Sequence, residues 1–432
     1  DTTATVYTKG ENVLNFIRGN RTLEGDKDTT DGYTAALPFR ERTSRQGDII
    51  NSDIWYTGAP ASNYTLAGYS AFTNTYKSRT PMLYVGGNDG MLHGFSATDG
   101  TEKIAYVPRG VVIELKKLAD PKYNHQYFVD GSPMTGDVLD GSTWRTILVG
   151  SLGAGGKGYF VLDVTDPSTF AEAKSQQLVL KDRTRGNGEN APDCNRTGIT
   201  AAEKAACLDV VEEDKDIGNI TAQPGRDSTN QLRATQIARL NNNRWAAVMG
   251  NGYNSANQRP VLLVQYLDGA RELMRIQASD DDKEKGNAAD NGLAAPTLVD
   301  LNGDSRVDIV YAGDNLGNLW KFDLTSELSS EWKAAFGIDK PLFTARGPSV
   351  KGATTRDKAQ PITAPPIVRA NDRTKCSEAD GDGKCKTTAE TQAVGGMMVS
   401  FGTGRNLTLQ DRNIEAAEYK YVQTLYSVLD NA

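Results

Sequence analysis

The sequence predicts an all-β fold, a modified β-propeller of six or seven blades with long loop insertions, on two observations. Segments rich in β-branched and aromatic residues and bounded by glycine or proline, which are typical of strands, greatly outnumber segments with a helical pattern. One pattern of apolar residues that runs into a glycine-rich turn also recurs at intervals of roughly 60 to 100 residues, as in repeat architectures. The repeats are residues 82–86, 146–150, 246–250, 309–313 and 398–402.

The shorter intervals between these repeats fit a four-stranded blade with long connecting loops. Two intervals are longer, and each contains one pair of cysteines. We therefore expect insertions at about 171–230 and 369–394 within a single propeller domain that covers residues 1–432. Short helices are expected at 200–207, 326–336 and 413–419.

The composition excludes several classes of partner. The chain has 432 residues, a net charge of −7 and no stripe of lysine and arginine, so nucleic acid is not expected as a partner. No apolar run approaches the roughly 18 residues that a membrane-spanning helix needs, so no membrane span is expected in this chain. The two histidines are too few for a zinc site built from histidine and cysteine.

The four cysteines form two local pairs within polar sequence, and neither pair has the C-x-x-C spacing. We predict two disulfides, Cys194–Cys207 and Cys376–Cys385, which indicate an oxidising compartment such as the periplasm or the cell surface. A disulfide near each insertion would limit the conformational entropy of a long loop. The alternative is four free thiols in a cytosolic protein.

Residues 300–308 predict a metal site. Oxygen-bearing side chains stand at positions 1, 3, 5 and 9 of this stretch, and a loop that curls on itself points them at one centre. Three carboxylates held this close would repel one another without a cation, and an all-oxygen ligand set favours Ca2+. Position 7 of such loops offers its backbone carbonyl. The candidate ligands are Asp300, Asn302, Asp304 and Asp308 by side chain and Arg306 by carbonyl.

Strand-like segments flank this metal loop, so it is predicted to join two strands of one blade. The corresponding loops at 140–144 and 240–245 carry no comparable ligand set. Position 6 is Ser305, where many such loops have glycine for a sharp turn, so we expect some backbone strain. Two further acidic stretches, 26–31 and 380–382, lack a full ligand set, and a solvated loop is the simpler interpretation of each.

Short motifs spread over nearly the whole chain resemble one known family. The most specific are 86–95, Gly-Gly-Asn-Asp-Gly-Met-Leu-His-Gly-Phe, and the metal loop, each in its expected order. The other motifs are 16–19, 47–52, 83–85, 106–109, 128–133 and 317–320. Together they resemble the C-terminal domain of the PilC/PilY family, which comprises large surface proteins associated with the tips of bacterial type IV pili.

The resemblance implies a seven-bladed modified propeller with a calcium loop in one blade. It also implies a type IV pilus biogenesis and adhesion factor without enzymatic activity. In this family the calcium loop regulates pilus extension versus retraction and supports surface attachment and twitching motility. The implied partners are the minor pilins of the pilus tip complex and a host or abiotic surface. The implied location is the bacterial cell surface at the pilus tip, reached by export through the periplasm.

Two alternatives belong to other functional classes. One is a periplasmic quinoprotein-like dehydrogenase, because 92–95 is similar to the blades of those enzymes, although their repeated blade tryptophans and adjacent cysteine pair are missing. The other is a propeller adhesin whose calcium is purely structural. Histidine catalysis has little support, because His93 lies in an apolar strand-like segment and His125 has no identifiable nucleophile partner.

Overall fold

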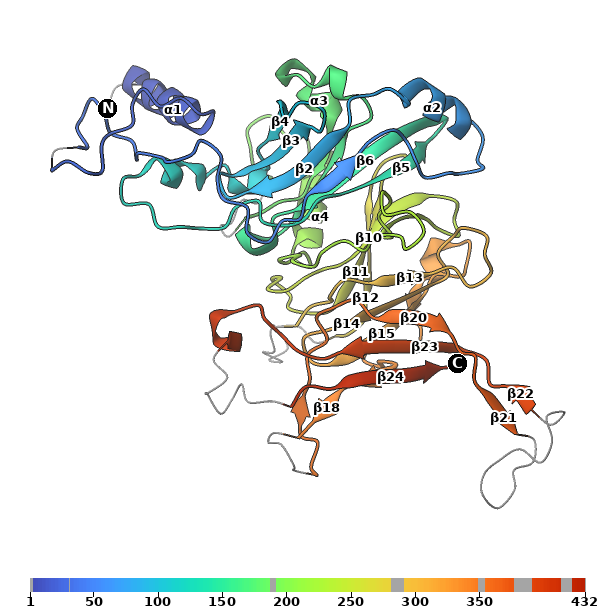
Figure 1. The fold of residues 1–432 in the computed structure, drawn as a ribbon. Coiled ribbons are helices and arrows are strands. Elements are labelled where there is room, and N and C mark those ends of the chain that lie inside the picture. Colours follow the sequence, from blue (N-terminus) through green and yellow to red (C-terminus); the bar gives the residue numbers. More distant parts are fainter. Residues whose placement is uncertain are drawn as a thin grey trace.

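The computed structural model describes residues 3–30, 32–186, 192–280, 291–348, 354–376, 391–412 and 422–431. Over these ranges the chain forms five antiparallel, blade-like sheets that follow one another in chain order, with the first and the fifth at opposite ends of the molecule (Figure 1). The all-β, propeller-type prediction is confirmed. A total of seven blades stays a prediction.

In the first three sheets, four strands pair in chain order, as the hairpin pattern of the sequence predicts. The first sheet contains β1 (Trp55–Thr57), β2 (Met82–Gly87), β3 (Met91–Ser96) and β4 (Glu102–Tyr106). The second contains β5 (Met134–Asp140), β6 (Thr143–Ser151), β7 (Tyr159–Asp163) and β8 (Val179–Asp182). The third contains β9 (Ile237–Arg239), β10 (Trp245–Gly250), β11 (Val261–Tyr266) and β12 (Leu273–Gln277).

The last two sheets depart from this plan. The fourth contains β13 (Thr297–Val299), β14 (Ile309–Gly313), β15 (Asn318–Asp323) and β16 (Lys333–Ala334), and β17 (Phe343–Thr344) also pairs with β15. The fifth has three strands, β20 (Ile367–Ala370), β23 (Met397–Gly402) and β24 (Leu425–Asp430). Two separate hairpins are formed by β18 (Arg346–Gly347) with β19 (Lys358–Ala359) and by β21 (Thr374–Cys376) with β22 (Thr391–Ala393).

The helices are short and lie outside the sheets. They are α1 (Thr3–Ile17), α2 (Tyr69–Tyr76), α3 (Ser175–Leu178) and α4 (Ala201–Asp214). Short 3-10 helices span Arg109–Val111, Leu115–Ala119, Gly153–Gly155, Pro167–Thr169, Glu172–Lys174, Ser329–Glu331 and Leu409–Arg412.

The structure confirms one expected helix and corrects another. The helix predicted at 200–207 is α4, which begins with a capping box between Thr200 and Glu203 and runs to Asp214. The helix predicted at 326–336 is wrong: this segment forms one 3-10 turn and then β16, because Ala334 pairs with Phe322 of the fourth sheet. The third expected helix, at 413–419, lies outside the described residues.

The five repeated segments all form the second strand of their sheets, namely β2, β6, β10, β14 and β23. In the second sheet, however, the residues of the sequence repeat are shifted by one position relative to the residues that face the neighbouring sheets. Val149 faces the third sheet and Leu148 faces the first, whereas Val248, two positions before Gly250, faces the following sheet. Ser151, the last residue of β6, therefore takes the place that glycine has in β10 and β14.

The long connections begin and end at sheet strands. Val179–Asp182, which the sequence analysis assigned to an insertion, forms β8 and pairs with β7, so the excursion from the sheets begins at residue 183 and ends before β9. The second excursion is the β21–β22 hairpin between β20 and β23. Cys376 ends β21, and the predicted Cys376–Cys385 bond lies outside the described residues because Cys385 is not among them.

Apolar clusters fill the space between consecutive sheets. Between the second and third sheets, Trp144 and Trp245 lie edge to face with ring centroids 5.7 Å apart. Tyr64, from the loop after β1, stacks on Trp144 at 5.5 Å. Such offset and edge-to-face contacts add to the free energy of burying the rings. Among the described residues, the cluster between the fourth and fifth sheets contains fewer buried residues than the other three clusters.

A buried side-chain hydrogen bond accompanies each junction between consecutive sheets. A hydrogen bond inside an apolar junction fixes the relative position of two sheets, because breaking it would leave a buried polar group without a partner. The pairs are Trp55–Thr135, Tyr159–Gln265, Asn241–Asp308 and Tyr311–Asp430.

Candidate metal centre

The predicted metal loop joins β13 to β14 in the fourth sheet. Its counterparts in the second and third sheets join β5 to β6 and β9 to β10, so all three loops occupy the same place in their blades. The structure therefore confirms that the loop is a hairpin connection. Residues 300–305 are exposed, whereas Val307 and Asp308 are buried immediately before β14.

The side-chain oxygens of the loop face the backbone of the same loop. Asp300 accepts hydrogen bonds from the N–H groups of Gly303 and Ser305, each at 2.7 Å. Asn302 accepts one from the N–H of Asp304 at 2.9 Å, and Asp304 accepts one from Arg306 at 2.9 Å. These hydrogen bonds fold the loop back on itself, but Asp300, Asp304 and Asp308 do not bring one carboxylate oxygen each within 4.8 Å of one another.

Asp308 differs from the other candidate ligands because it is 4% exposed. Its Oδ2 accepts a hydrogen bond from the N–H of Leu301 at 2.7 Å, which closes the loop. Its Oδ1 accepts one at 2.9 Å from Nδ2 of Asn241, in the neighbouring hairpin of the third sheet. Sequence analysis missed Asn241, because nothing in a ligand pattern points to a residue 67 positions away.

The backbone of the loop is strained at one position. Ser305 has φ of +66° and Gly303 has φ of +80°, both in the left-handed region. Glycine adopts this conformation without steric cost, whereas the Cβ of Ser305 makes it unfavourable. The strain expected at position 6 from the sequence is therefore present.

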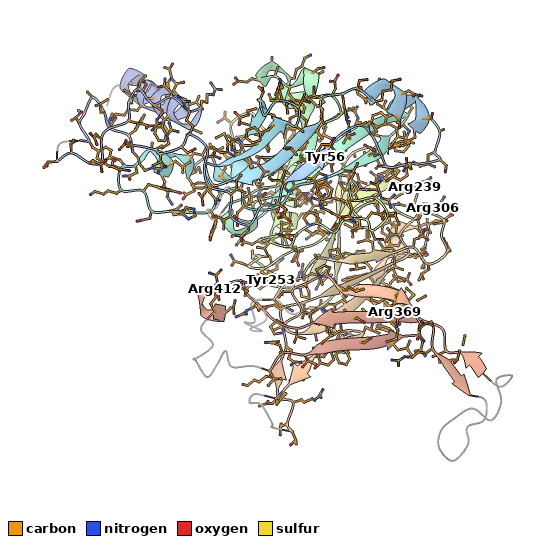
Figure 2. All side chains as sticks on the ribbon, in the orientation of Figure 1. Tyr56, Arg239, Tyr253, Arg306, Arg369 and Arg412 are labelled. Carbon is orange, nitrogen blue, oxygen red and sulfur yellow. A yellow bond between two sulfur atoms is a disulfide. The ribbon has the colours of Figure 1, made fainter. Side chains whose placement is uncertain are left out.

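The side chain of Arg306 lies against the loop. Its Nη1 lies 3.6 Å from Oδ2 of Asp304, and its side chain is 26% exposed. Figure 2 shows Arg306 beside Arg239 of β9, and repulsion between them contributes to lowering the pKa of Arg239, after its burial. Arg306 thus neutralises part of the negative charge of the loop.

The donor set fits a hard divalent cation. Carboxylate or amide oxygens stand at positions 1, 3, 5 and 9, and no nitrogen or sulfur ligand competes among them. Asp300, Asn302, Asp304 and Asp308 would hold Ca2+ by side chain and Arg306 by carbonyl. The ion would supply charge neutralisation and a fixed loop shape.

A second group of acidic side chains lies far away in the sequence. Asp26, Asp28 and Glu41 each place one carboxylate oxygen within 4.8 Å of the other two, and in the described part of the chain they are the one such group of three. The sequence analysis had noted 26–31 but missed Glu41, which only folding brings to this loop. Exposed acidic groups of this kind are common without an ion.

His93 is a packed residue of β3, as expected. It is 3% exposed, its Nδ1 lies 2.6 Å from Oε1 of Glu102, and its Nε2 lies 3.0 Å from Asp89. Burial alone would lower the pKa of His93, but the hydrogen bonds and charges of Asp89 and Glu102 outweigh burial and raise it. His125 is about half exposed and lies 2.8 Å from Asp48.

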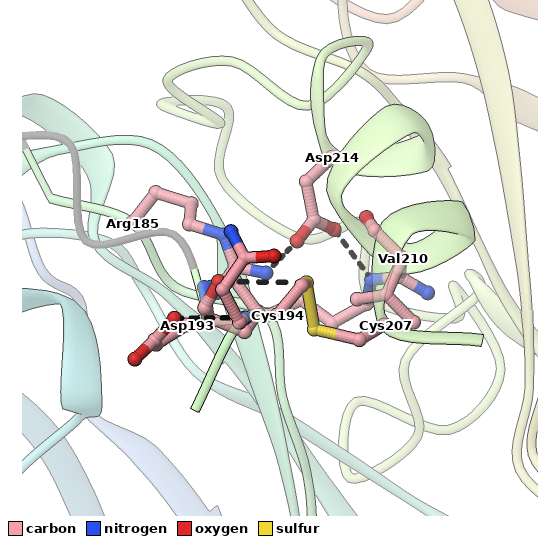
Figure 3. The surroundings of a disulfide bond; sticks show 9 residues. Arg185, Asp193, Cys194, Cys207, Val210 and Asp214 are labelled. Carbon is pink, nitrogen blue, oxygen red and sulfur yellow. Dashed lines mark hydrogen bonds and ion pairs between the residues drawn. A yellow bond between two sulfur atoms is a disulfide. The ribbon is translucent and has the colours of Figure 1, made fainter. Parts of the chain in front are cut away.

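The predicted disulfide Cys194–Cys207 is present and ties the segment that precedes α4 to that helix (Figure 3). Asp214, at the end of this helix, is 4% exposed by side chain and pairs with Arg183 at 2.8 Å and with Arg185. The disulfide therefore holds the middle of α4, and the buried ion pair holds its C-terminal end. The oxidising compartment predicted from the cysteines agrees with this bond.

These features define a β-propeller with a candidate cation loop on one blade hairpin, and the comparisons with known proteins agree. The family model described as the PilY1 beta-propeller domain matches residues 46–203 and 186–432. The chain therefore belongs to the PilY1 beta-propeller domain family.

Two relatives match nearly the full length of this chain. One is the type IV pilus biogenesis factor PilY1 homolog of Xylella fastidiosa, 34% identical over 97% of this chain and 24% of the relative. Another is the type IV pilus biogenesis factor PilY1 of Pseudomonas aeruginosa strain PAK, 32% identical over 98% of this chain and 31% of the relative. The chain thus spans less than a third of the length of each of these relatives.

Among solved structures, the crystal structure of the Pseudomonas aeruginosa PilY1 C-terminal domain is similar, with a TM-score of 0.57 and 31% identity. The match covers 87% of this chain and 64% of that domain. Across the ranges that the structure describes, every helix is too short or too polar to span a bilayer.

Proposed function

We propose that this chain is the propeller part of a type IV pilus biogenesis and adhesion factor that binds Ca2+ at residues 300–308. The family membership, and relatives named as type IV pilus biogenesis factors, support the pilus role. The observation that supports the calcium role is the loop itself, a hairpin connection with oxygen-bearing side chains at positions 1, 3, 5 and 9 that accept hydrogen bonds from the loop's own backbone.

The proposed mechanism is local ordering of the hairpin. Without an ion, the carboxylates of Asp300, Asp304 and Asp308 repel one another, and this repulsion is opposed by the loop's own hydrogen bonds and by the contact of Arg306 with Asp304. With Ca2+ bound, the repulsion is removed, and the more rigid loop presents a defined surface to a partner. At a calcium concentration about 100 times Kd, binding stabilises the closed form by about 2.7 kcal/mol. This is enough to shift a marginal conformational equilibrium, but not to decide whether a large propeller folds.

Terbium luminescence and calorimetry test the site directly. We expect the wild-type protein to bind Tb3+ and Ca2+, and Asp304→Ala to bind at least tenfold more weakly because one charged ligand is lost. Asp28→Ala is the matched control, since it removes a carboxylate from the other acidic group. If only Asp28→Ala weakens binding, the ion is held at Asp26, Asp28 and Glu41 and the assignment to 300–308 is wrong.

A cell assay tests the regulatory part of the proposal. We propose that calcium at the loop controls pilus extension versus retraction, and so supports surface attachment and twitching motility, with minor pilins at the pilus tip as partners. Bacteria that carry Asp304→Ala in the full-length protein should show altered surface piliation and reduced twitching zones. Normal piliation and twitching in a strain whose protein has lost calcium binding would leave the ion a purely structural role.

The remaining parts of the proposal concern location and domain organisation. We propose export through the periplasm to the cell surface at the pilus tip, which the Cys194–Cys207 disulfide supports. We also propose one propeller domain over 1–432 with two long excursions. Limited proteolysis should cut first within these excursions, and early cleavage between two sheets elsewhere would contradict a single domain.

We propose no enzymatic activity for this chain. The relatives are named as pilus biogenesis factors, and no observation on the described residues favours a reaction. A redox-dye assay with added quinone and calcium checks this statement. Turnover by the purified protein would restore the quinoprotein-like alternative.

A further inference from the structure

We propose that Asn241, in the third sheet, is a positioning residue for the calcium site of the fourth sheet, so that calcium binding and the junction between these two sheets are coupled. This inference rests on the proposed calcium binding at 300–308. It concerns how the site is built and what its occupation does to the rest of the molecule.

The amide of Asn241 is placed to hold the end of the metal loop. Its Nδ2 lies 2.9 Å from Oδ1 of Asp308, 3.0 Å from the carbonyl oxygen of Val307 and 2.9 Å from that of Leu324. Asn241 is 5% exposed. A buried amide with three acceptors around one nitrogen has a single favourable orientation, so Asn241 fixes the direction of the Asp308 carboxylate.

Backbone contacts place the two hairpins together. Leu240 and Val307 form a parallel β-bridge, and the N–H of Val307 donates to the carbonyl oxygen of Arg239 at 3.0 Å. On its other side, the carbonyl of Asp308 accepts a hydrogen bond from the N–H of Leu324 at 2.8 Å. The position of the Asp308 carboxylate is therefore set by the junction between the third and fourth sheets, and not by the loop alone.

The other ligands lack such support. Asp300, Asn302 and Asp304 are exposed and are oriented by hydrogen bonds from the loop's own backbone. A loop that is ordered only by itself loses conformational entropy when it closes on an ion. One ligand that is already fixed by a neighbouring sheet reduces this cost, and residues that orient metal ligands commonly change metal affinity by 10- to 100-fold when mutated.

Coupling between two sites is reciprocal. If the Asn241–Asp308 contact raises calcium affinity, then bound calcium must stabilise the contact between the third and fourth sheets by the same factor. Calcium would thus act beyond the loop, on the way two blades are held together.

Calorimetry and terbium luminescence on single variants test the positioning role. Asn241→Leu keeps the number and branching of the side-chain heavy atoms and removes the amide, and we expect calcium affinity to fall about tenfold or more. The terbium emission lifetime should also shorten, because a displaced Asp308 leaves room for an extra water on the ion. The matched control is Asn242→Leu in the same hairpin, whose amide donates to Tyr266 and not to the loop, and it should bind normally. Equal affinity and lifetime in wild type and Asn241→Leu would overturn the inference.

Hydrogen exchange on the wild-type protein tests the coupling even if the Asn241 variants fail to fold. Calcium should slow amide exchange in 237–245 of the third sheet as well as in 300–308, while the corresponding hairpin at 140–144 of the second sheet should not change. Protection confined to 300–308 would overturn the inference while leaving the proposed calcium site intact. Absence of calcium binding by the wild-type protein would instead refute the proposed function.

Discussion

The hydroxyl of Tyr159, in β7, donates a hydrogen bond of 2.7 Å to Oε1 of Gln265, in β11, across the junction between the second and third sheets. Both side chains are fully buried. The amide nitrogen of Gln265 donates to backbone carbonyls of its own sheet, including that of Tyr266 at 2.8 Å, so its oxygen faces Tyr159. Burial raises the pKa of Tyr159, which therefore stays a proton donor at physiological pH.

Tyr159→Phe removes this donor and should destabilise the protein. The oxygen of Gln265 would stay buried without a partner, which costs about 1–3 kcal/mol. Urea unfolding should show a lower midpoint with an unchanged slope, because the surface exposed on unfolding is nearly the same. An unchanged midpoint would mean that water replaces the tyrosine hydroxyl at this junction.

Two substitutions in the metal loop should have opposite effects. Ser305→Gly relieves a left-handed conformation that costs a residue with a Cβ about 1–2 kcal/mol, and it should raise loop stability and tighten calcium binding. Gly303→Ala introduces the same cost at φ of +80° and should weaken binding. Calcium titrations of both variants check the prediction, and a change in the same direction for both would contradict it.

His93 should make stability depend on pH near neutrality. Its folded-state pKa is raised above about 6.5, the unfolded value, so its charged form is the one that the fold stabilises. The stabilisation is fully present below pH about 6.5 and is lost as pH rises through the higher folded-state pKa. Thermal melting from pH 6 to 9 should therefore show a loss for wild type that is absent in His93→Gln. Parallel curves would show that Asp89 and Glu102 do not hold a charged imidazole.

Removal of the Cys194–Cys207 bond should lower stability without dismantling the sheets. The bond closes a loop of 13 residues, which corresponds to about 3 kcal/mol of loop entropy in the unfolded chain. Arg183, Arg185 and Asp214 still hold the end of α4, so hydrogen exchange should increase around 194–207 and stay slow in β7. Cys194→Ser with Cys207→Ser provides the measurement. Fast exchange in β7 would show that the disulfide supports the second sheet itself.

Local sequence patterns predicted the features that depend on neighbouring residues. The second strands of the sheets, the hairpin place of residues 300–308 and the strain at Ser305 all follow from turn chemistry and apolar repeats within short segments. The sequence repeat was aligned one residue away from its structural position in β6. Gly150 and Ser151 are both small, and only packing decides which of them takes the place that glycine has in the other sheets.

These local patterns could not predict contacts between residues that are distant in the sequence. Asn241 and Glu41 approach their acidic partners only through the packing of sheets and loops. The segment at 326–336 has helical spacing, but pairing of Ala334 with Phe322 outweighs that local preference. Tertiary hydrogen bonds and sheet pairing, rather than intrinsic propensity, decide such cases.

The succession of sheets has a mechanical consequence. The ends of the chain lie with the first and the fifth sheets (Figure 1), so a pulling force applied there would pass through the junctions in series. A series of this kind yields first at its weakest junction. Judged from the described residues, the apolar cluster between the fourth and fifth sheets is the smallest, and with the Tyr311–Asp430 contact beside it this junction would rupture before the tryptophan-rich junction of the second and third sheets. Under tension, the C-terminal sheet would therefore be the part that gives way.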